Sequence, residues 1–163
     1  MTNLKKIKSK IYSISEIKKI VEKWKKNGEK IIFSNGCFDI IHLGHIEILA
    51  KSADLGGKLI IGVNSDKSIK ELKGNSRPIL KQQARLATIA SLFFVDAVVV
   101  FEELTPQKVI ELIKPNIITK GGDYNKEDVI GKDFISKYGG KVVILPLSKG
   151  FSTTNILDTI NDG

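Results

Sequence analysis

The sequence has little of several features that would assign it to a special class of protein. It contains one cysteine, Cys37, in 163 residues, which excludes an internal disulfide framework and a zinc site built from cysteines. No apolar run approaches the roughly 18 residues that a membrane span needs. The lysine-rich start is not followed by the apolar stretch of a secretory signal. We therefore expect a cytoplasmic protein without a membrane partner.

Positive charge is concentrated at the amino terminus. Residues 1–30 hold ten lysines and three glutamates, which account for +7 of the formal net charge of +8. A nucleic-acid-binding arm is one interpretation. However, no arginine or aromatic pattern is interleaved with these lysines, so we favour a solvated helix and expect no nucleic-acid partner. The expected organisation is a basic leader and N-terminal helix over 1–29, with a loose leader at 1–12, and one domain over 30–163.

The hydrophobic pattern indicates alternating strands and helices. Hydrophobic residues make up 42% and charged residues 27% of the chain, a balance typical of a globular domain. Short runs rich in isoleucine and valine predict strands covered on both faces, at residues 31–34, 58–63, 97–101, 116–120 and 141–145. Helical patterns fall at 13–26, before the first strand, and at 43–54, 82–93, 105–114 and 127–138 between the strands, with a last short helix near Ser152. The sequence thus predicts a Rossmann-like, doubly wound α/β fold with a parallel five-stranded sheet and an extra N-terminal helix.

The densest group of candidate site residues follows the first strand. The only two histidines of the chain, His42 and His45, lie there on either side of Gly44. Open α/β sheets bind ligands at the carboxyl ends of their strands, and a helix start with unpaired N–H groups attracts phosphate. Two imidazoles on adjacent turns can add directed donors to the same phosphates. A capping histidine beside a surface histidine is the alternative, and a zinc site would need ligands that the sequence lacks.

Two later segments complete the expected site. Lys120, Gly121 and Asp123 belong to a glycine turn after the fourth strand, where a carboxylate can accept hydrogen bonds from hydroxyls. Ser152, Thr153 and Thr154 follow a glycine at a helix start, where one hydroxyl can cap the helix and another can reach a phosphate.

The stretch N-G-C-F-D-x-x-H-x-G-H resembles the HxGH nucleotidyltransferases, in their cytidylyltransferase-like branch. Further along, K-G-G-D-Y and G-F-S-T-T-N-I are similar to the heptose 1-phosphate adenylyltransferases, and the likeness runs from about residue 30 to the end. It implies transfer of AMP from ATP to D-glycero-β-D-manno-heptose 1-phosphate, giving ADP-heptose and pyrophosphate for the lipopolysaccharide core. Two alternatives stay open. One is a glycerol-3-phosphate cytidylyltransferase-like enzyme, although Leu147 departs from the pattern of that family. The other is a non-catalytic nucleotide-binding module.

The resemblance also implies roles for individual residues. The expected catalytic residues are His42, His45, Lys73 in a polar loop, and Arg85. The expected nucleotide-binding residues are Asn35, Gly36, Cys37, Phe38, His42, Gly44, His45, Lys120, Gly121, Asp123, Ser152, Thr153 and Thr154. The expected substrate-binding residues are Asp39, Asn64, Lys73, Asp123 and Tyr124. From the residues alone, Asn35 and Asp39 could equally form turns, and Cys37 could be a small buried hydrophobe.

The expected partners are small molecules. They are ATP and heptose 1-phosphate. We expect Mg²⁺ to accompany ATP, with phosphate oxygens and water as its ligands in place of a protein metal site. In many relatives the unit is fused to a sugar kinase, for which this chain is too short, so we expect a separate kinase to supply the sugar phosphate. A homodimer is a further expectation.

Overall fold

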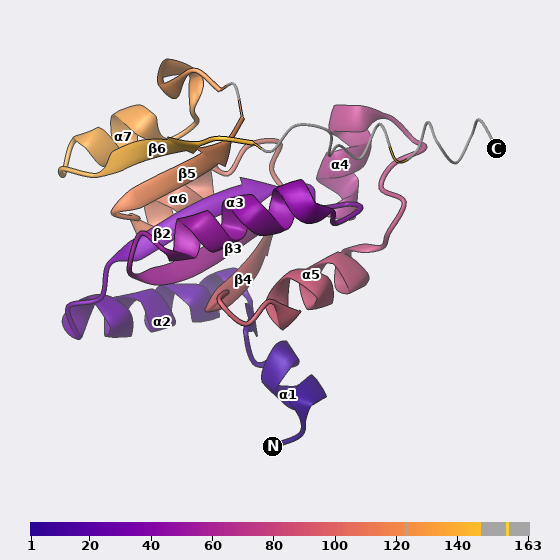
Figure 1. Cartoon of the computed structure of the whole chain (residues 1–163), viewed down its shortest axis with the longest axis horizontal. Helices are drawn as coiled ribbons and strands as arrows, with labels where there is room; N and C mark the ends of the chain where they lie inside the picture. The colour runs from indigo at the N-terminus through magenta and orange to yellow at the C-terminus, as the bar shows by residue number, and fades with distance from the viewer. Residues whose placement is uncertain (123, 148–155, 157–163) are drawn as a thin grey trace.

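The fold is built on a parallel sheet. The computed structural model describes residues 1–122, 124–147 and 156. Within them, six strands are arranged in the order β1-β4-β3-β2-β5-β6 (Figure 1). The strands are Ile11–Tyr12, Ile31–Gly36, Lys58–Asn64, Ala97–Phe101, Ile117–Gly121 and Lys141–Leu145. All five neighbouring pairs are parallel, which confirms the predicted Rossmann-like α/β class.

The strand count differs from the prediction because of the first residues of the chain. Residues 1–12 do not form a loose leader: they contain helix α1 (Asn3–Lys8), capped by Thr2, and strand β1. Strand β1 extends the sheet by pairing Ile11 with Val98 and Tyr12 with Val99 of β4. A strand of two residues gives no alternating pattern, so the sequence offered no signal for it.

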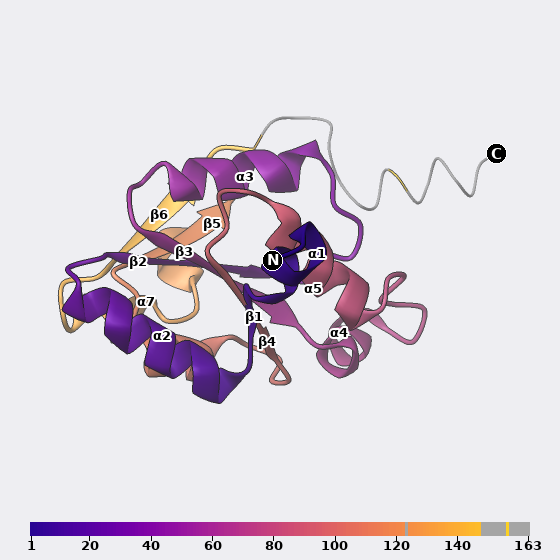
Figure 2. The same ribbon diagram turned by 90° about the horizontal axis from the view of Figure 1, so that it is seen from below.

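Helices cover both faces of the sheet (Figure 2). The helices α2 (Ile14–Lys26), α6 (Gln107–Ile113) and α7 (Lys132–Ser136) pack on one face. The helices α1, α3 (Leu43–Ala53) and α5 (Gln82–Ser91) pack on the other. Successive residues of β2 therefore enter opposite clusters, and both clusters exclude water, which is why the strands are apolar throughout.

Most helix ends follow local signals that the sequence carries. The capping box predicted at the start of α2 is confirmed: Glu16 Oε2 accepts from the Ser13 N–H at 2.8 Å, and Ser13 Oγ accepts from the Glu16 N–H at 3.3 Å. The helix predicted for 127–138 is instead a short 3₁₀ turn, η1 (Lys126–Asp128), followed by α7. Gly131 separates them with a φ of 88°, and a Cβ there would come within 2.8 Å of Ile110.

Helix α4 (Asp66–Lys73) occupies the segment that was expected to be a polar loop. Ser65 caps it by accepting a hydrogen bond from the Ser68 N–H at 3.1 Å. Its only fully buried apolar side chain is Ile69, so an amphipathic stripe is scarcely visible in the sequence. The consequence for function is that Lys73 lies at the end of a helix.

The strand order creates one place where the chain reverses its direction across the sheet. From β2 it passes outward to β3 and β4, and then returns to β5 and β6 on the other side of β2. The carboxyl ends of β2 and β5 therefore flank a topological switch point, the usual ligand crevice of such sheets. The helix predicted near Ser152 lies outside the described residues, Ile156 excepted. Within the described part of the chain, no helix has the length and hydropathy to cross a membrane.

Candidate functional site

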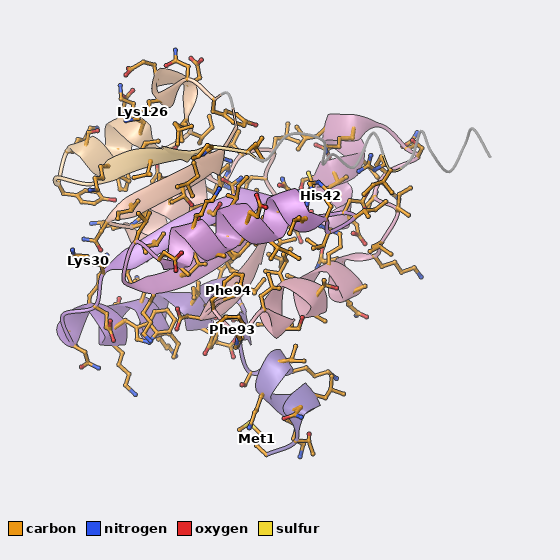
Figure 3. All side chains as sticks on the ribbon, viewed as in Figure 1. Met1, Lys30, His42, Phe93, Phe94 and Lys126 are labelled. Atoms are coloured by element: carbon orange, nitrogen blue, oxygen red, sulfur yellow. The ribbon has the colours of Figure 1, made fainter. Side chains whose placement is uncertain are left out.

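A cavity of about 370 Å³ opens at the switch point. The ends of β2 and β5, the amino-terminal half of α3 and the end of α4 surround it, and Figure 3 shows His42 at the amino end of α3. Its lining residues are Ser34, Asn35, Gly36, Phe38, His42, Gly44, His45, Ile48, Leu49, Lys73, Lys120, Gly121, Tyr124 and Leu147. The structure thus brings most of the predicted nucleotide-binding residues and two of the predicted substrate-binding residues into one cavity.

The rings of the two histidines lie against each other at the start of α3. Their ring centroids are 3.8 Å apart and their planes differ by 34°. The His42 side chain does not cap the helix, whose first turn is closed by the His42 carbonyl. Both Nδ1 atoms are buried without a hydrogen-bond partner among the described residues. An unsatisfied buried polar atom costs about 1–3 kcal/mol, so both rings hold hydrogen-bonding capacity that the described residues leave unused.

The surroundings favour the neutral form of both rings. Burial lowers the pKa of His42. Burial lowers the pKa of His45 to about 4, and repulsion from Lys73, and from His42 when that ring is protonated, adds to the effect. A neutral imidazole has one N–H donor and one acceptor nitrogen. Because protonation of these rings is unfavourable, they suit hydrogen bonding to phosphate oxygens better than proton transfer.

Lys120 links the two strands at the switch point. Its ammonium Nζ donates to Asn35 Oδ1 at 2.8 Å and lies 5.7 Å from the centroid of the Tyr124 ring. Burial lowers the pKa of Lys120 to about 8, and none of the ion pairs among the described residues includes it. A buried cation without a carboxylate partner is stabilised by an anionic ligand.

Two glycines allow the cavity wall to close. A Cβ on Gly121 would lie 1.9 Å from Ile48 Cδ1, so α3 could not pack as closely against a residue with a side chain. Gly122 has a φ of 89°, and a Cβ there would lie 2.5 Å from Leu147 Cδ1. Ile48 and Leu147 thus form an apolar part of the wall. Ile48 was missed by sequence analysis, although its position three residues after His45 places it on the same side of the helix.

Sequence analysis also missed two lining residues whose role looked purely structural. Ser34 follows the apolar residues of β2, and Leu49 belongs to the apolar stripe of α3. Both residues belong to the core and also line the cavity. Sequence patterns indicate that a residue is buried but not that it faces a cavity.

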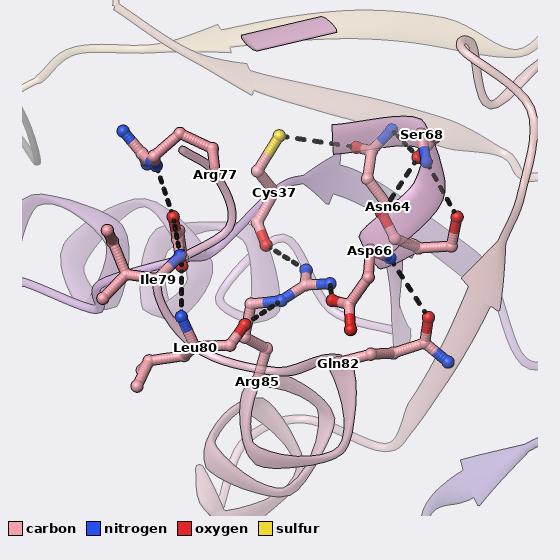
Figure 4. Close-up of polar contacts among 11 residues, drawn as sticks. Cys37, Asn64, Asp66, Ser68, Arg77, Ile79, Leu80, Gln82 and Arg85 are labelled. Atoms are coloured by element: carbon pink, nitrogen blue, oxygen red, sulfur yellow. Dashed lines mark hydrogen bonds and ion pairs between the residues drawn. The ribbon is translucent and has the colours of Figure 1, made fainter. Parts of the chain in front are cut away.

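Four predicted site residues do not line the cavity: Cys37, Asp39, Asn64 and Arg85. Figure 4 shows Arg85 among polar partners of the surrounding loops. Its side chain is fully buried and its guanidinium is engaged by protein groups, so the structure does not bring it to a phosphate in the cavity. Asn64 donates to Ser68 Oγ at 3.2 Å and accepts from the Cys37 thiol at 3.9 Å.

Asp39, like Arg85, is buried and bonded to protein groups, and it was expected to bind substrate. Its side chain is 1% exposed, and its carboxylate oxygens accept from backbone N–H groups and from Arg77. The predicted residues Asp123, Ser152, Thr153 and Thr154 lie outside the described residues.

Comparisons with known proteins agree on one family. A sequence profile described as cytidylyltransferase-like matches residues 33–156. The bifunctional protein HldE of Koribacter versatilis is 43% identical over 150 residues, which are 92% of this chain and 31% of that protein. The chain therefore spans about a third of the length of the curated relatives it matches.

Two solved structures are similar to this one. A lipopolysaccharide core biosynthesis protein from Thermoplasma volcanium is 34% identical, covers 76% of this chain and 100% of its own, and superposes with a TM-score of 0.61. A pantoate-β-alanine ligase from Francisella tularensis, in complex with ATP in its β-γ form and β-alanine, has a TM-score of 0.63 at 15% identity, over 93% of this chain and 76% of its own. The second likeness concerns the fold alone.

Proposed function

This chain belongs to the cytidylyltransferase-like family, and on that premise we propose that it is an adenylyltransferase that transfers AMP from ATP to heptose 1-phosphate. The products are ADP-heptose and pyrophosphate. The name of the Thermoplasma relative, which refers to the lipopolysaccharide core, supports that destination for the sugar. A sugar kinase supplies the acceptor. The reaction takes place in the cytoplasm, where ATP is available.

One observation carries the proposal. The cavity combines two neutral, stacked histidines with buried Nδ1 atoms, the amino end of α3, and the lysines Lys73 and Lys120, while its described lining contains no carboxylate. A helix start, directed N–H donors and cations are the groups that bind polyphosphate. A site of this composition suits a ligand with several negative charges.

The reaction needs no covalent intermediate with the protein. An oxygen of the sugar phosphate attacks the α-phosphorus of ATP, the bond from that phosphorus to the bridging oxygen breaks, and pyrophosphate leaves with the electron pair. The attacking oxygen is already ionised, so no general base is required. Catalysis then consists of positioning the two substrates and stabilising the charge that develops on pyrophosphate. His42 and His45 bind the β- and γ-phosphates, and Lys73 assists them.

We propose that Mg²⁺ enters with ATP. The described residues contain no group of three or more histidine, cysteine, aspartate or glutamate side chains that could hold a metal ion, and the lining just described does not fit a protein-held Mg²⁺. Phosphate oxygens and water are the ligands that this ion prefers in nucleotide sites. The protein's contribution lies in the imidazoles and ammonium groups around the phosphates.

The apolar wall favours ATP over CTP. Ile48 and Leu147 line the cavity beside Gly121 and Tyr124, and pack against the larger adenine. We expect kcat/KM with heptose 1-phosphate to be at least about tenfold higher for ATP than for CTP, the discrimination that a modest difference in apolar contact gives. A coupled pyrophosphate assay over both nucleotides, with heptose 1-phosphate and glycerol 3-phosphate as acceptors, measures it.

The outcomes of this assay distinguish the three candidate functions. Turnover with CTP and glycerol 3-phosphate would replace the heptose assignment by a glycerol-3-phosphate cytidylyltransferase-like one. Nucleotide binding without pyrophosphate release from any pair would support a non-catalytic module.

A further inference from the structure

Phe38 has an unfavourable backbone conformation beside the histidines. Its φ of 48° lies in the left-handed region, which bulky residues seldom adopt. Its buried ring lies over Gly36, where a Cβ would come within 3.2 Å of it. The ring also meets the His45 ring edge-on, with the centroids 5.5 Å apart. The left-handed conformation of Phe38 therefore positions its ring against the His45 ring.

Asp39 holds the chain on one side of Phe38. Its carboxylate accepts hydrogen bonds from the N–H of Ile79 at 2.8 Å and of Leu80 at 2.9 Å, and from Arg77 Nε at 2.6 Å. Burial alone would raise the pKa of Asp39, but the bonds from Leu80, Ile79 and Arg77 hold it below its ordinary value. The carboxylate is thus ionised and fixed to the loop before α5.

Arg85 holds the chain on the other side. Its Nη1 donates to the Cys37 carbonyl at 2.6 Å, its Nε to the Leu80 carbonyl at 3.1 Å, and its Nη2 to Asp66 Oδ1 at 2.8 Å. Figure 4 shows this guanidinium between the Cys37 loop, the Leu80 loop and the start of α4. One buried side chain therefore ties the segment before the histidines to two other elements.

We propose that Asp39 and Arg85 are positioning residues that hold Phe38 in its left-handed conformation and thereby fix the orientation of the His45 ring. Neither touches the cavity. They act on it through a segment of three residues whose ends they hold and whose middle ring contacts a histidine. Strain in a backbone persists only where the surrounding contacts hold it in place, and here those contacts are made by two buried charges. This role rests on the proposed function only where it concerns turnover.

The test reads His45 directly. The chain has two histidines, so a His42→Gln variant assigns both imidazole signals in an NMR titration. In Asp39→Asn and Arg85→Met, we expect the His45 signal to move and its pKa to rise from about 4 toward the ordinary 6.5, because the ring leaves its buried position. If the proposed reaction is correct, kcat also falls roughly tenfold to a hundredfold.

Asp96→Asn is the matched control. Asp96 also accepts from a backbone N–H, that of Leu59 at 2.9 Å, and pairs with Lys58 at 3.2 Å, but it does not line the cavity. We expect this variant to leave the His45 signal and pKa unchanged. If Arg85→Met does not fold, Asp39→Asn and the charge-conserving Arg85→Lys decide the question.

Two results would overturn the proposal. One is a folded Asp39→Asn or Arg85→Met variant with an unchanged His45 signal and pKa. The other is loss of folding in all three variants of the pair while Asp96→Asn folds, since the two residues would then maintain the fold and not the site. A changed His45 without any activity in the wild type would leave the positioning role intact and contradict the proposed function alone.

Discussion

Replacing either histidine with alanine is expected to slow turnover at least about a hundredfold while the fold persists. Loss of one preorganised donor to developing charge typically costs about 2.7–4 kcal/mol in the transition state. The rings of His42 and His45 stack at 3.8 Å and bind the same phosphates in our proposal, so their effects should not add. We expect the double variant to lose less than the product of the two single losses.

Steady-state kinetics with ATP and heptose 1-phosphate, together with thermal unfolding, measure this effect. We expect the unfolding temperatures to change little, since neither Nδ1 atom has a hydrogen-bond partner among the described residues that it could lose. A kcat near that of the wild type in either single variant would contradict the assignment of the histidines to phosphate binding.

Replacing Lys120 with methionine is expected to lower kcat/KM by roughly tenfold to 150-fold, because a hydrogen bond to a charged group contributes about 1.5–3 kcal/mol. Methionine keeps an unbranched side chain of similar length but has no charge. Lys108→Met is the matched control, since Lys108 is exposed and pairs with Glu103 on the surface. We expect it to leave kcat/KM unchanged.

The charge on Lys120 also predicts a pH dependence. Burial lowers the pKa of Lys120 to about 8, and the protonated form binds an anion. The value of kcat/KM, which reports the free enzyme, should therefore be constant below that pH and fall as the pH rises through it. Lys120→Met should lack this fall. A wild-type profile that stays level well above pH 8 would argue against a phosphate contact of Lys120.

The fold class and the location of the candidate site could be predicted from the sequence because both depend on strong, local signals. Buried strands of isoleucine and valine, and glycines where the chain turns, predicted five of the six strands. The histidines at His42 and His45 follow the strand that forms one side of the switch point, so their place at the cavity could be expected from chain order alone.

The contacts of Asp39 and Arg85 could not be predicted from such signals. A carboxylate and a guanidinium near a motif look like ligand-binding groups, and only the three-dimensional contacts show that backbone atoms from distant segments use them instead. Ile48 was missed for a related reason: an apolar residue on a helix is assigned to the core unless its contact with Gly121 at the cavity wall is known. Helix α4 was missed because its polar sequence buries little apolar surface.

The most direct test of the central claim follows phosphorus atoms during the reaction. A ³¹P NMR time course of the protein with ATP, Mg²⁺ and heptose 1-phosphate identifies which bond of ATP breaks. We predict that the three ATP signals and the sugar phosphate signal are replaced by pyrophosphate and by the paired signals of a nucleoside diphosphate sugar, in equal amounts, and that His45→Ala slows this exchange at least about a hundredfold. Formation of ADP with inorganic phosphate, or an unchanged spectrum with active, folded protein, would contradict the account.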